Sequence, residues 1–180
     1  MSKLYTKITT RLQNFIEAQK IFFVATAPNS GRINLSPKGM DSFRIVDENR
    51  VLWLNVTGSG NETAAHLLEN PRITIMFCSF EGAPNILRLY GKGKEIKEGD
   101  KNWNALIKLF PETPGTRQIF DITIGSAQTS CGMSIPFFDY KGERNELNDW
   151  AANQGKDGIK KYWTAKNQTS IDGLPTKILE

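Results

Sequence analysis

The sequence predicts a mainly β fold (α+β), a small and mainly antiparallel barrel with peripheral helices. Three observations lead to this prediction. Six or seven segments have the pattern of β-strands, three or four short segments have the pattern of helices, and most of them are joined by short turns. The 180 residues contain no internal repeat and no long linker. We therefore expect a single domain over residues 1–180, with a helical tail at 141–180.

The N-terminal half begins with a helix and continues with strands. Apolar residues at the spacing of one helical face predict an amphipathic helix over residues 6–19. The segment IFFVATA, residues 21–27, is apolar enough to be a strand that is buried on both faces. The turn APNSGR follows it, and Pro37 ends the next strand, so residues 21–36 are expected to form a hairpin. Two further strands are predicted at 43–47 and 51–57.

The C-terminal half alternates strands with short helices. A helix over 62–69 is stopped by Asn70-Pro71, and the alternating segment RITIMFCSF after it is typical of a half-buried strand. The glycines in ILRLYGKGKEI indicate a bulge or a close approach of the backbone. A short helix near Asp100, a long strand RQIFDITIGSAQTS and an amphipathic stretch over 143–166 complete the prediction.

The composition argues against several classes of protein. The formal net charge is +4, and the lysines are scattered among acidic residues, which indicates a solvated surface rather than a nucleic-acid interface. No apolar run approaches the roughly 18 residues that a membrane span needs, and the first ten residues resemble no targeting signal. We therefore expect a cytoplasmic protein that binds neither nucleic acid nor membrane. Cys78 and Cys131 form no zinc motif and no disulfide framework.

The stretch GSGNETAAHLLENP places a loose turn directly before a short helix. Ser59 and Glu62 have the spacing of a capping box, and Asn61 offers an alternative cap. Unpaired amides at a helix N-terminus stabilise an anion, and Gly58 and Gly60 let a ligand approach the backbone closely. The stretch therefore has two interpretations, an anion site or a simple cap of a connector helix.

Three further stretches carry groups that can contact a ligand. NLSPKG places the ammonium of Lys38 at the end of a strand, as a phosphate partner or as a surface charge. In ILRLYGKG, Arg88 points away from the apolar face, as a fork for an anion or as an exposed arginine. QTSCGMSIP gathers small polar residues around Cys131. The single histidine, His66, is expected to be a surface or packing residue or a haem ligand, and no catalytic triad is formed.

These four stretches, in this order and at this spacing, resemble the pyridoxamine 5′-phosphate oxidase-like FMN-binding proteins. The resemblance covers roughly residues 20–140 and is specific as a combination, although each piece alone is weak. It implies a six- to seven-stranded antiparallel split β-barrel with peripheral helices. It also implies a homodimer that binds FMN at the subunit interface, in which the flavin carries the chemistry.

The resemblance also implies which residues contact the cofactor. Lys38 corresponds to a phosphate or ring contact, and Gln128 and Ser130 correspond to residues that reach across to the partner's flavin. No catalytic residue and no metal ligand is assigned. The expected cofactor-binding residues are Ser36, Lys38, Thr57, Ser59, Asn61, Glu62, Thr63, Arg88, Gln128 and Ser130.

Two departures from the family's oxidase limit the function that is predicted. The oxidase has Ser-Arg-Lys before its connector helix, whereas this chain has Asn61-Glu62-Thr63, so that a carboxylate stands where a cation is expected. The ending SIDGLPTKILE lacks the arginines that grip the substrate phosphate, so the substrate is not expected to be pyridoxamine phosphate. We expect an FMN-dependent oxidoreductase of unknown substrate. The alternatives are a non-catalytic flavin- or haem-binding module acting as a sensor, carrier or stress protein, and a relative whose pocket has lost its cofactor.

Overall fold

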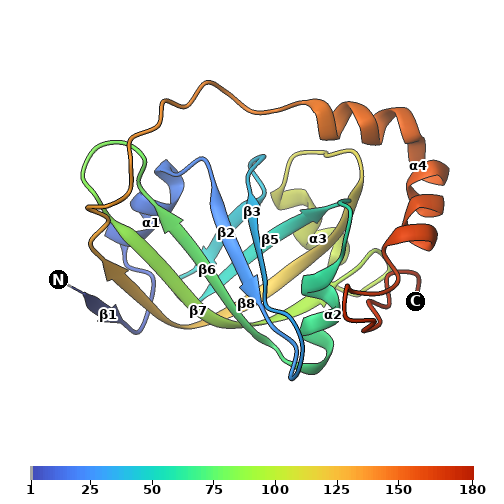
Figure 1. Cartoon of the computed structure of the whole chain (residues 1–180), viewed down its shortest axis with the longest axis horizontal. Coiled ribbons are helices and arrows are strands. Elements are labelled where there is room, and N and C mark those ends of the chain that lie inside the picture. Colours follow the sequence, from blue (N-terminus) through green and yellow to red (C-terminus); the bar gives the residue numbers. More distant parts are fainter. Residues whose placement is uncertain (1) are drawn as a thin grey trace.

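The computed structural model describes residues 2–180 and contains an eight-stranded sheet (Figure 1). The strand order is β3-β2-β6-β7-β8-β5-β4, with β1 paired to β8, and every neighbouring pair is antiparallel. The sheet curls into an open barrel with helices at its periphery, which confirms the predicted split-barrel fold class. The strands are β1 Lys3–Tyr5, β2 Phe22–Thr26, β3 Asn34–Lys38, β4 Phe43–Asp47, β5 Arg50–Val56, β6 Arg72–Cys78, β7 Ile86–Ile96 and β8 Thr116–Ser130. The helices are α1 Thr10–Ala18, α2 Glu62–Glu69, α3 Trp103–Leu106, the 3-10 turn η1 Ile107–Leu109 and α4 Glu146–Lys166.

The concave side of the sheet holds the main apolar core. Aromatic rings from β2, β5, β6 and β8 pack together there, with Phe22 and Phe77 at 5.7 Å and Trp53 and Phe120 at 4.9 Å between ring centroids. Helix α1 closes one end of this core with the buried side chains of Leu12 and Ile16. Burial of large apolar side chains of this kind is the main source of folding free energy.

The N-terminal boundary differs from the prediction. The chain forms the short strand β1 and starts α1 only at Thr10, because the side chain of Thr9 accepts a hydrogen bond from the Leu12 amide at 3.4 Å and caps the helix. Strand β1 pairs with the end of β8, from Lys3 opposite Thr129 to Tyr5 opposite Ala127. Three residues are too few for a periodic pattern, so this strand was not predicted.

Strand β7 contains the bulge that its glycines indicated. The register with β8 shifts between Tyr90 and Gly91, and a Cβ at Gly91 would lie 2.5 Å from the Thr123 carbonyl oxygen. Only glycine permits this approach of two backbones. The bulge bends β7 and β8 together, and a second apolar cluster under α3 and η1 covers the continuation of these strands.

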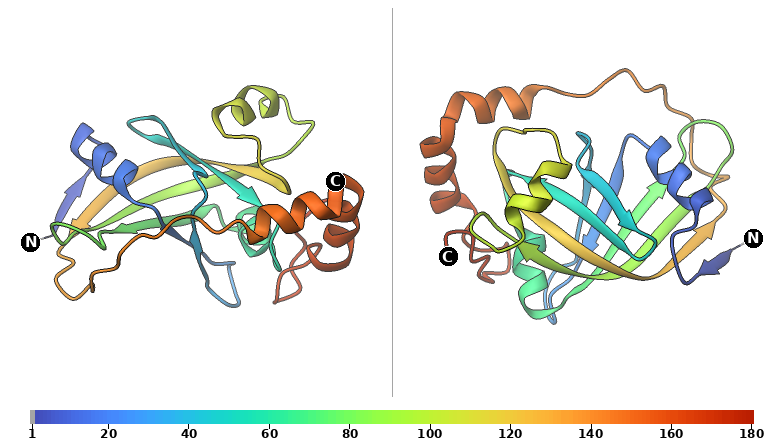
Figure 2. Two further views of the ribbon diagram at one scale, coloured as in Figure 1. Left: turned by 90° about the horizontal axis from the view of Figure 1, so that it is seen from above. Right: turned by 180° about the vertical axis from the view of Figure 1, so that it is seen from behind.

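The C-terminal segment wraps around the barrel (Figure 2). Residues 131–145 run along the outside of the sheet and bring α4 to the side where α2 begins. Gly155, with φ 62° and ψ 177°, interrupts α4 and lets the chain turn between its two halves. No helix within residues 2–180 is both long and apolar enough to cross a lipid bilayer.

Candidate cofactor-binding site

A cavity of about 530 Å³ lies where β3, the end of β5, the loop before α2 and the start of β8 meet. We call it the loop cavity. It combines three cations with a carboxylate, amides and hydroxyls, and its polar lining surface suits an anionic ligand more than an apolar one. Of the cations, Arg32 is paired with Asp172. Its lining residues are Arg32, Ile33, Asn34, Leu35, Ser36, Lys38, Trp53, Asn55, Val56, Gly58, Ser59, Gly60, Asn61, Glu62, Thr63, Arg117 and Ile171.

Lys38 projects into the loop cavity from the last position of β3, opposite Phe22 of β2. Its Nζ lies 5.0 Å from the centroid of the Trp53 ring, which places the ammonium over an aromatic face. Burial, and then the positive charge of Arg117, lower the pKa of the Lys38 ammonium to about 8. An anion in the cavity would oppose both effects and favour the charged form.

Arg117 is a further cation of the loop cavity, and the sequence analysis did not identify it. It stands at the start of β8, is 6% exposed, and donates from Nη1 to the Gly60 carbonyl oxygen and to Asn167 Oδ1, each at 3.0 Å. Burial lowers its pKa to about 10, although the nearby carboxylate of Glu95 acts in the opposite direction. Within residues 2–180 its Nε has no hydrogen-bond partner.

The loop before α2 is held by long-range contacts, and the predicted capping box is wrong. Asn61 occupies the N-cap position without a side-chain cap, and its Oδ1 instead accepts from Gln118 Nε2 at 2.8 Å. The Glu62 carboxylate accepts from the Ile171 amide, at 3.1 Å for Oε1 and 3.2 Å for Oε2. The side chain of Asn167 donates to the carbonyl oxygens of Gly58, at 3.1 Å, and Ser59, at 3.4 Å. Partners far away in the sequence therefore replace the local cap.

Six of the ten expected site residues line the loop cavity: Ser36, Lys38, Ser59, Asn61, Glu62 and Thr63. Thr57 does not, since its hydroxyl is buried between two other partners. It donates to the Gly115 carbonyl oxygen and accepts from Trp163 Nε1, each at 2.8 Å, and so ties β5 to α4.

Arg88, Gln128 and Ser130 lie on the outer face of the sheet, outside the loop cavity of their own chain. Arg88 is opposite Gln128 in the β7–β8 pair and donates to Ser130 Oγ at 3.1 Å. The hydroxyl of Tyr90 donates to Gln128 Oε1 at 3.1 Å. A single chain therefore does not bring these three residues to the other six, and their cofactor role stays a prediction.

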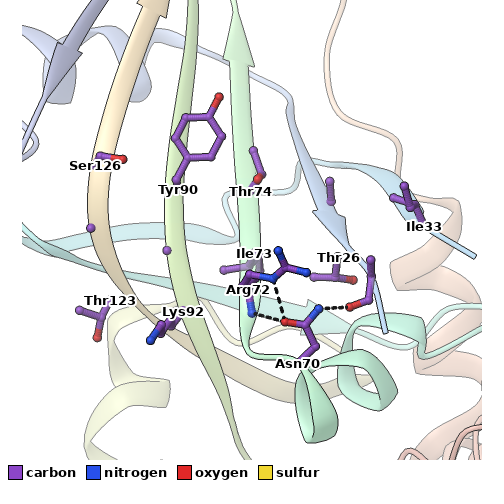
Figure 3. A pocket seen from close by; sticks show the side chains of 14 residues that line it. Thr26, Ile33, Asn70, Arg72, Ile73, Thr74, Tyr90, Lys92, Thr123 and Ser126 are labelled. Atoms are coloured by element: carbon purple, nitrogen blue, oxygen red, sulfur yellow. Dashed lines mark hydrogen bonds between the residues drawn. The ribbon is translucent and has the colours of Figure 1, made fainter. Parts of the chain in front are cut away.

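A second hollow of about 660 Å³ runs along the same outer face, over β2, β6, β7 and β8 (Figure 3). We call it the sheet groove. Asn70 organises its lower end, where it donates to the Ala27 carbonyl oxygen at 2.9 Å and accepts from Arg72 Nε at 3.1 Å. Lys92, opposite Arg72 in the β6–β7 pair, lines this lower end from β7, and Tyr90 stands further along the same strand. Ile33 lines both the sheet groove and the loop cavity, so the two hollows meet at the β2–β3 hairpin.

Comparison with known proteins shows to which family this chain belongs. The family model described as pyridoxamine 5′-phosphate oxidase matches residues 8–131, which is more than half of the chain. The chain belongs to the pyridoxamine 5′-phosphate oxidase family. The pyridoxamine 5′-phosphate oxidase family protein ustO of Aspergillus flavus is 34% identical over 195 residues, covering 97% of this chain and 78% of that protein.

Solved structures agree with the split-barrel fold of this family. A variant of HupZ from Group A Streptococcus matches with a TM-score of 0.56 and 21% identity over 68% of this chain and 99% of that chain. A putative pyridoxamine 5′-phosphate oxidase from Lactobacillus delbrueckii matches with a TM-score of 0.55 and 16% identity over 68% of this chain and 94% of that chain. At these identities the likeness concerns the fold.

The two cysteines and the histidine do not line the loop cavity. Cys78 is buried, which raises the pKa of its thiol, and Cys131 is exposed at the end of β8. His66 is 1% exposed and its Nδ1 lies 3.0 Å from Thr26 Oγ1, so its ring packs between α2 and β2. Across residues 2–180 there is no group of three or more His, Cys, Asp or Glu side chains that could hold a metal ion.

Proposed function

We propose that the protein is an FMN-binding oxidoreductase of the pyridoxamine 5′-phosphate oxidase family, with a substrate other than pyridoxamine phosphate. One observation carries the proposal: Lys38 and Arg117 converge on one cavity beside an open glycine loop, in a chain of this family. Two cations and unpaired donors, among them Asn61 Nδ2, fit a phosphate group. A Cβ at Gly58 would meet nothing within 4 Å, so the loop leaves room for a ligand close to its backbone.

Each group of this chain has a definite part in holding the flavin. Lys38 and Arg117 bind the phosphate, and the hydroxyls of Ser36, Ser59 and Thr63 extend the polar lining on which the ligand lies. Bound flavin supplies the hydride or electron transfer. The protein supplies position and exclusion of water, which explains why no acid–base pair is needed beside the cavity.

The proposal includes a homodimer with the cofactor between the two subunits. Arg88, Gln128 and Ser130 form a polar patch on the outer sheet face, away from the loop cavity of their own chain. A second copy packed on this face brings the patch of one subunit to the cavity of the other, as a two-fold interface repeats each contact. Ile33 and Leu35 support this packing because they line the cavity and are 76% and 63% exposed.

The absorption spectrum of the freshly purified protein tests the proposal. Oxidised flavin bands, or tight binding of added FMN followed by fluorescence, are expected. Bleaching of these bands by NADH or NADPH under anaerobic conditions then separates an oxidoreductase from a protein that binds flavin without turnover. A Soret band indicates a haem-binding module instead, and a colourless protein that ignores added FMN overturns the proposal.

A further inference from the structure

A third cavity, of about 320 Å³, lies at the open seam of the barrel, where a short loop joins the edge strands β3 and β4. We call it the seam pocket. The end of α1, the first residue of β2 and the start of β4 also line it, and it shares no lining residue with the loop cavity. Pockets for small molecules have volumes of roughly 300–1,000 Å³, so the seam pocket has room for a ligand with a single ring.

Three aromatic rings line the apolar side of the seam pocket. Phe43 of β4 packs against Phe22 of β2 and Phe77 of β6, with ring centroids 5.1 and 5.2 Å apart. Phe22 and Phe77 are buried, whereas Phe43 is only partly buried, so its ring is accessible from the pocket. A further ring placed against Phe43 gains apolar burial and the favourable contacts of an aromatic pair.

One carboxylate and one ammonium stand at the rim of the seam pocket. Glu17 and Lys20 line it at the end of α1, yet neither takes part in an ion pair within 4.0 Å among residues 2–180. Glu17 Oε1 accepts from Gln13 Nε2 at 2.8 Å, which leaves Oε2 for a ligand. The other charges of the lining, Asp41 and Arg44, neutralise each other through two contacts of 2.7 and 2.8 Å. The rim therefore offers a ligand one charge of each sign.

The loop between β3 and β4 forms one wall of the pocket and has an unfavourable backbone conformation. Met40 and Asp41 have φ of 64° and 51°, in the left-handed region that residues other than glycine rarely adopt. The Asp41–Arg44 pair and the Ser42 hydroxyl, which donates to the Gly39 carbonyl oxygen at 2.6 Å, hold this conformation. Strain that the surrounding structure maintains is typical of ligand sites, and here it fixes the shape of the wall.

The segment between β8 and α4 contacts both sides of the pocket. Lys20 Nζ lies 5.8 Å from the centroid of the Tyr140 ring, and the Tyr140 hydroxyl donates to Glu143 Oε1 at 2.8 Å. Glu143 reaches the loop on the other side, since a Cβ at Gly39 would lie 3.6 Å from its Oε2. An ammonium that rests against an aromatic ring keeps its charge, so Lys20 can still bind a carboxylate.

We propose that the seam pocket binds a free α-amino acid with an aromatic side chain. The ring of the ligand lies against Phe43, its ammonium faces Glu17 and its carboxylate faces Lys20. An α-amino acid carries both charges on one carbon atom, which matches two opposite charges at the rim of an aromatic pocket. The inference does not depend on the function proposed above, because the seam pocket and the loop cavity are separate.

The test compares L-phenylalanine with phenethylamine, which lacks the carboxylate, and hydrocinnamate, which lacks the ammonium. Calorimetric titration should show the tightest binding for L-phenylalanine. Lys20→Gln should weaken the binding of L-phenylalanine and hydrocinnamate about threefold to tenfold and leave phenethylamine nearly unchanged. Glu17→Gln should weaken L-phenylalanine and phenethylamine and leave hydrocinnamate nearly unchanged. The same loss for all three ligands in either variant overturns the proposal.

Two further variants test the ring contact and the position of the charges. Phe43→Leu keeps an apolar side chain but removes the aromatic pair, so it should weaken all three ligands, while circular dichroism and the thermal midpoint report that it is folded. Arg11→Gln, on the exposed side of α1 and outside the pocket, is the control for charge and should change none of the affinities. Unchanged affinities in folded Phe43→Leu protein would place the ligand elsewhere and overturn the proposal.

FMN separates this inference from the proposed function. L-phenylalanine should bind equally well with and without saturating FMN, and mutual exclusion of the two would make the seam pocket part of the flavin site and overturn the inference. If the protein binds no flavin but binds L-phenylalanine with the expected dependence on Glu17 and Lys20, the inference stands and the proposed function fails. No binding of L-phenylalanine to folded wild-type protein at millimolar concentration overturns the inference alone.

Discussion

The ionisation of Lys38 makes the charge of the loop cavity depend on pH. Its pKa of about 8 in the ligand-free protein means that the ammonium is present below pH 8 and is lost above it. A phosphate monoester has its second pKa near 6, so the ligand itself stays a dianion throughout this range. If FMN is the ligand, as we propose, its affinity between pH 7 and 9 is therefore controlled by the ionisation of the protein.

We predict that FMN affinity falls as the pH rises past 8, approaching about tenfold per pH unit. Lys38→Gln should bind FMN about tenfold to a hundredfold more weakly at pH 7. It should keep only the shallower pH dependence that Glu95 contributes through Arg117. Fluorescence titrations from pH 7 to 9 measure both curves, and parallel curves for the two proteins would contradict the assignment.

The ionisation of Glu95 leads to a second prediction, which concerns how the stability of the protein depends on pH. Burial raises the pKa of Glu95 from 4.5 to about 7, against the attraction of Lys97 and Arg117. The folded protein therefore favours the protonated carboxyl. The stability that this group contributes is complete below pH 4.5 and is lost as the pH rises to about 7.

Glu95→Gln, which mimics the protonated form, should raise the free energy of unfolding at pH 8 by on the order of 3 kcal/mol and change it little near pH 4. Urea unfolding at the two pH values measures the difference. Exposed Glu98→Gln, three positions further along the chain, is the control. A gain of the same size at both pH values would show that ionisation is not the cause.

Some residues of the loop cavity could be predicted from local turn chemistry. Lys38 after Pro37 and the glycines before α2 stand out in the sequence, and the structure brings them to one cavity. Arg117 could not be found in this way, because a single arginine at the start of a strand looks like an edge charge. Its burial comes from Asn167, fifty positions later. The capping box failed for the same reason, since Ile171 competes for the Glu62 carboxylate.

Among the elements, strands were predicted better than helix boundaries. Alternation and apolar runs located β2 and β4 to β8, because a sheet that is buried on one face or on both leaves that pattern. The start of α1 is set by the Thr9 cap, and the pairing of β1 depends on the end of β8, more than a hundred residues away. Contacts between distant residues of this kind leave no periodic signal.

The β7 bulge makes a prediction about element packing. Gly91→Ala should lower the free energy of unfolding by about 1–3 kcal/mol, because the added Cβ would lie 2.5 Å from the backbone oxygen of Thr123. Gly125→Ala on β8 is the matched control, since its nearest contact, the Tyr90 carbonyl oxygen, is at 3.8 Å. The urea midpoints of the two variants give the comparison. Equal midpoints would mean that β7 relaxes without cost.

The proposed dimer can be tested by mixing subunits, because Lys38 and Gln128 lie on different faces of the same chain. If each flavin site takes Lys38 from one chain and Gln128 from the other, Lys38→Gln and Gln128→Ala proteins should each bind FMN poorly. After unfolding together and refolding, about a quarter of the sites should recover wild-type affinity, since half of the dimers are mixed and each has one intact site. Sedimentation checks that the dimer forms. No recovery in a confirmed mixed dimer would place both residues in one site of the same chain or outside any site.

The fold class of the chain was readable from strand pattern and turns alone, and the family match agrees with it. What the pattern could not supply is the arrangement of the two hollows, because they meet only after β2 and β3 are folded against the rest of the sheet. The expected site residues lie partly in the loop cavity and partly on the outer face of the sheet, and the register of the paired strands decides this. It is also the reason why a dimer enters the proposal.

The contacts of Asn167, Ile171 and Asp172 have a consequence for biosynthesis. These residues hold Gly58, Glu62 and Arg32 in place, yet they are translated after every strand of the barrel. A chain that has been released from the ribosome only as far as residue 160 contains every strand of the sheet, while one wall of its loop cavity is still missing. We therefore expect the loop cavity to bind its ligand only after residues 167–172 have left the ribosome. For the same reason, a fusion partner or tag is better joined at the N-terminus.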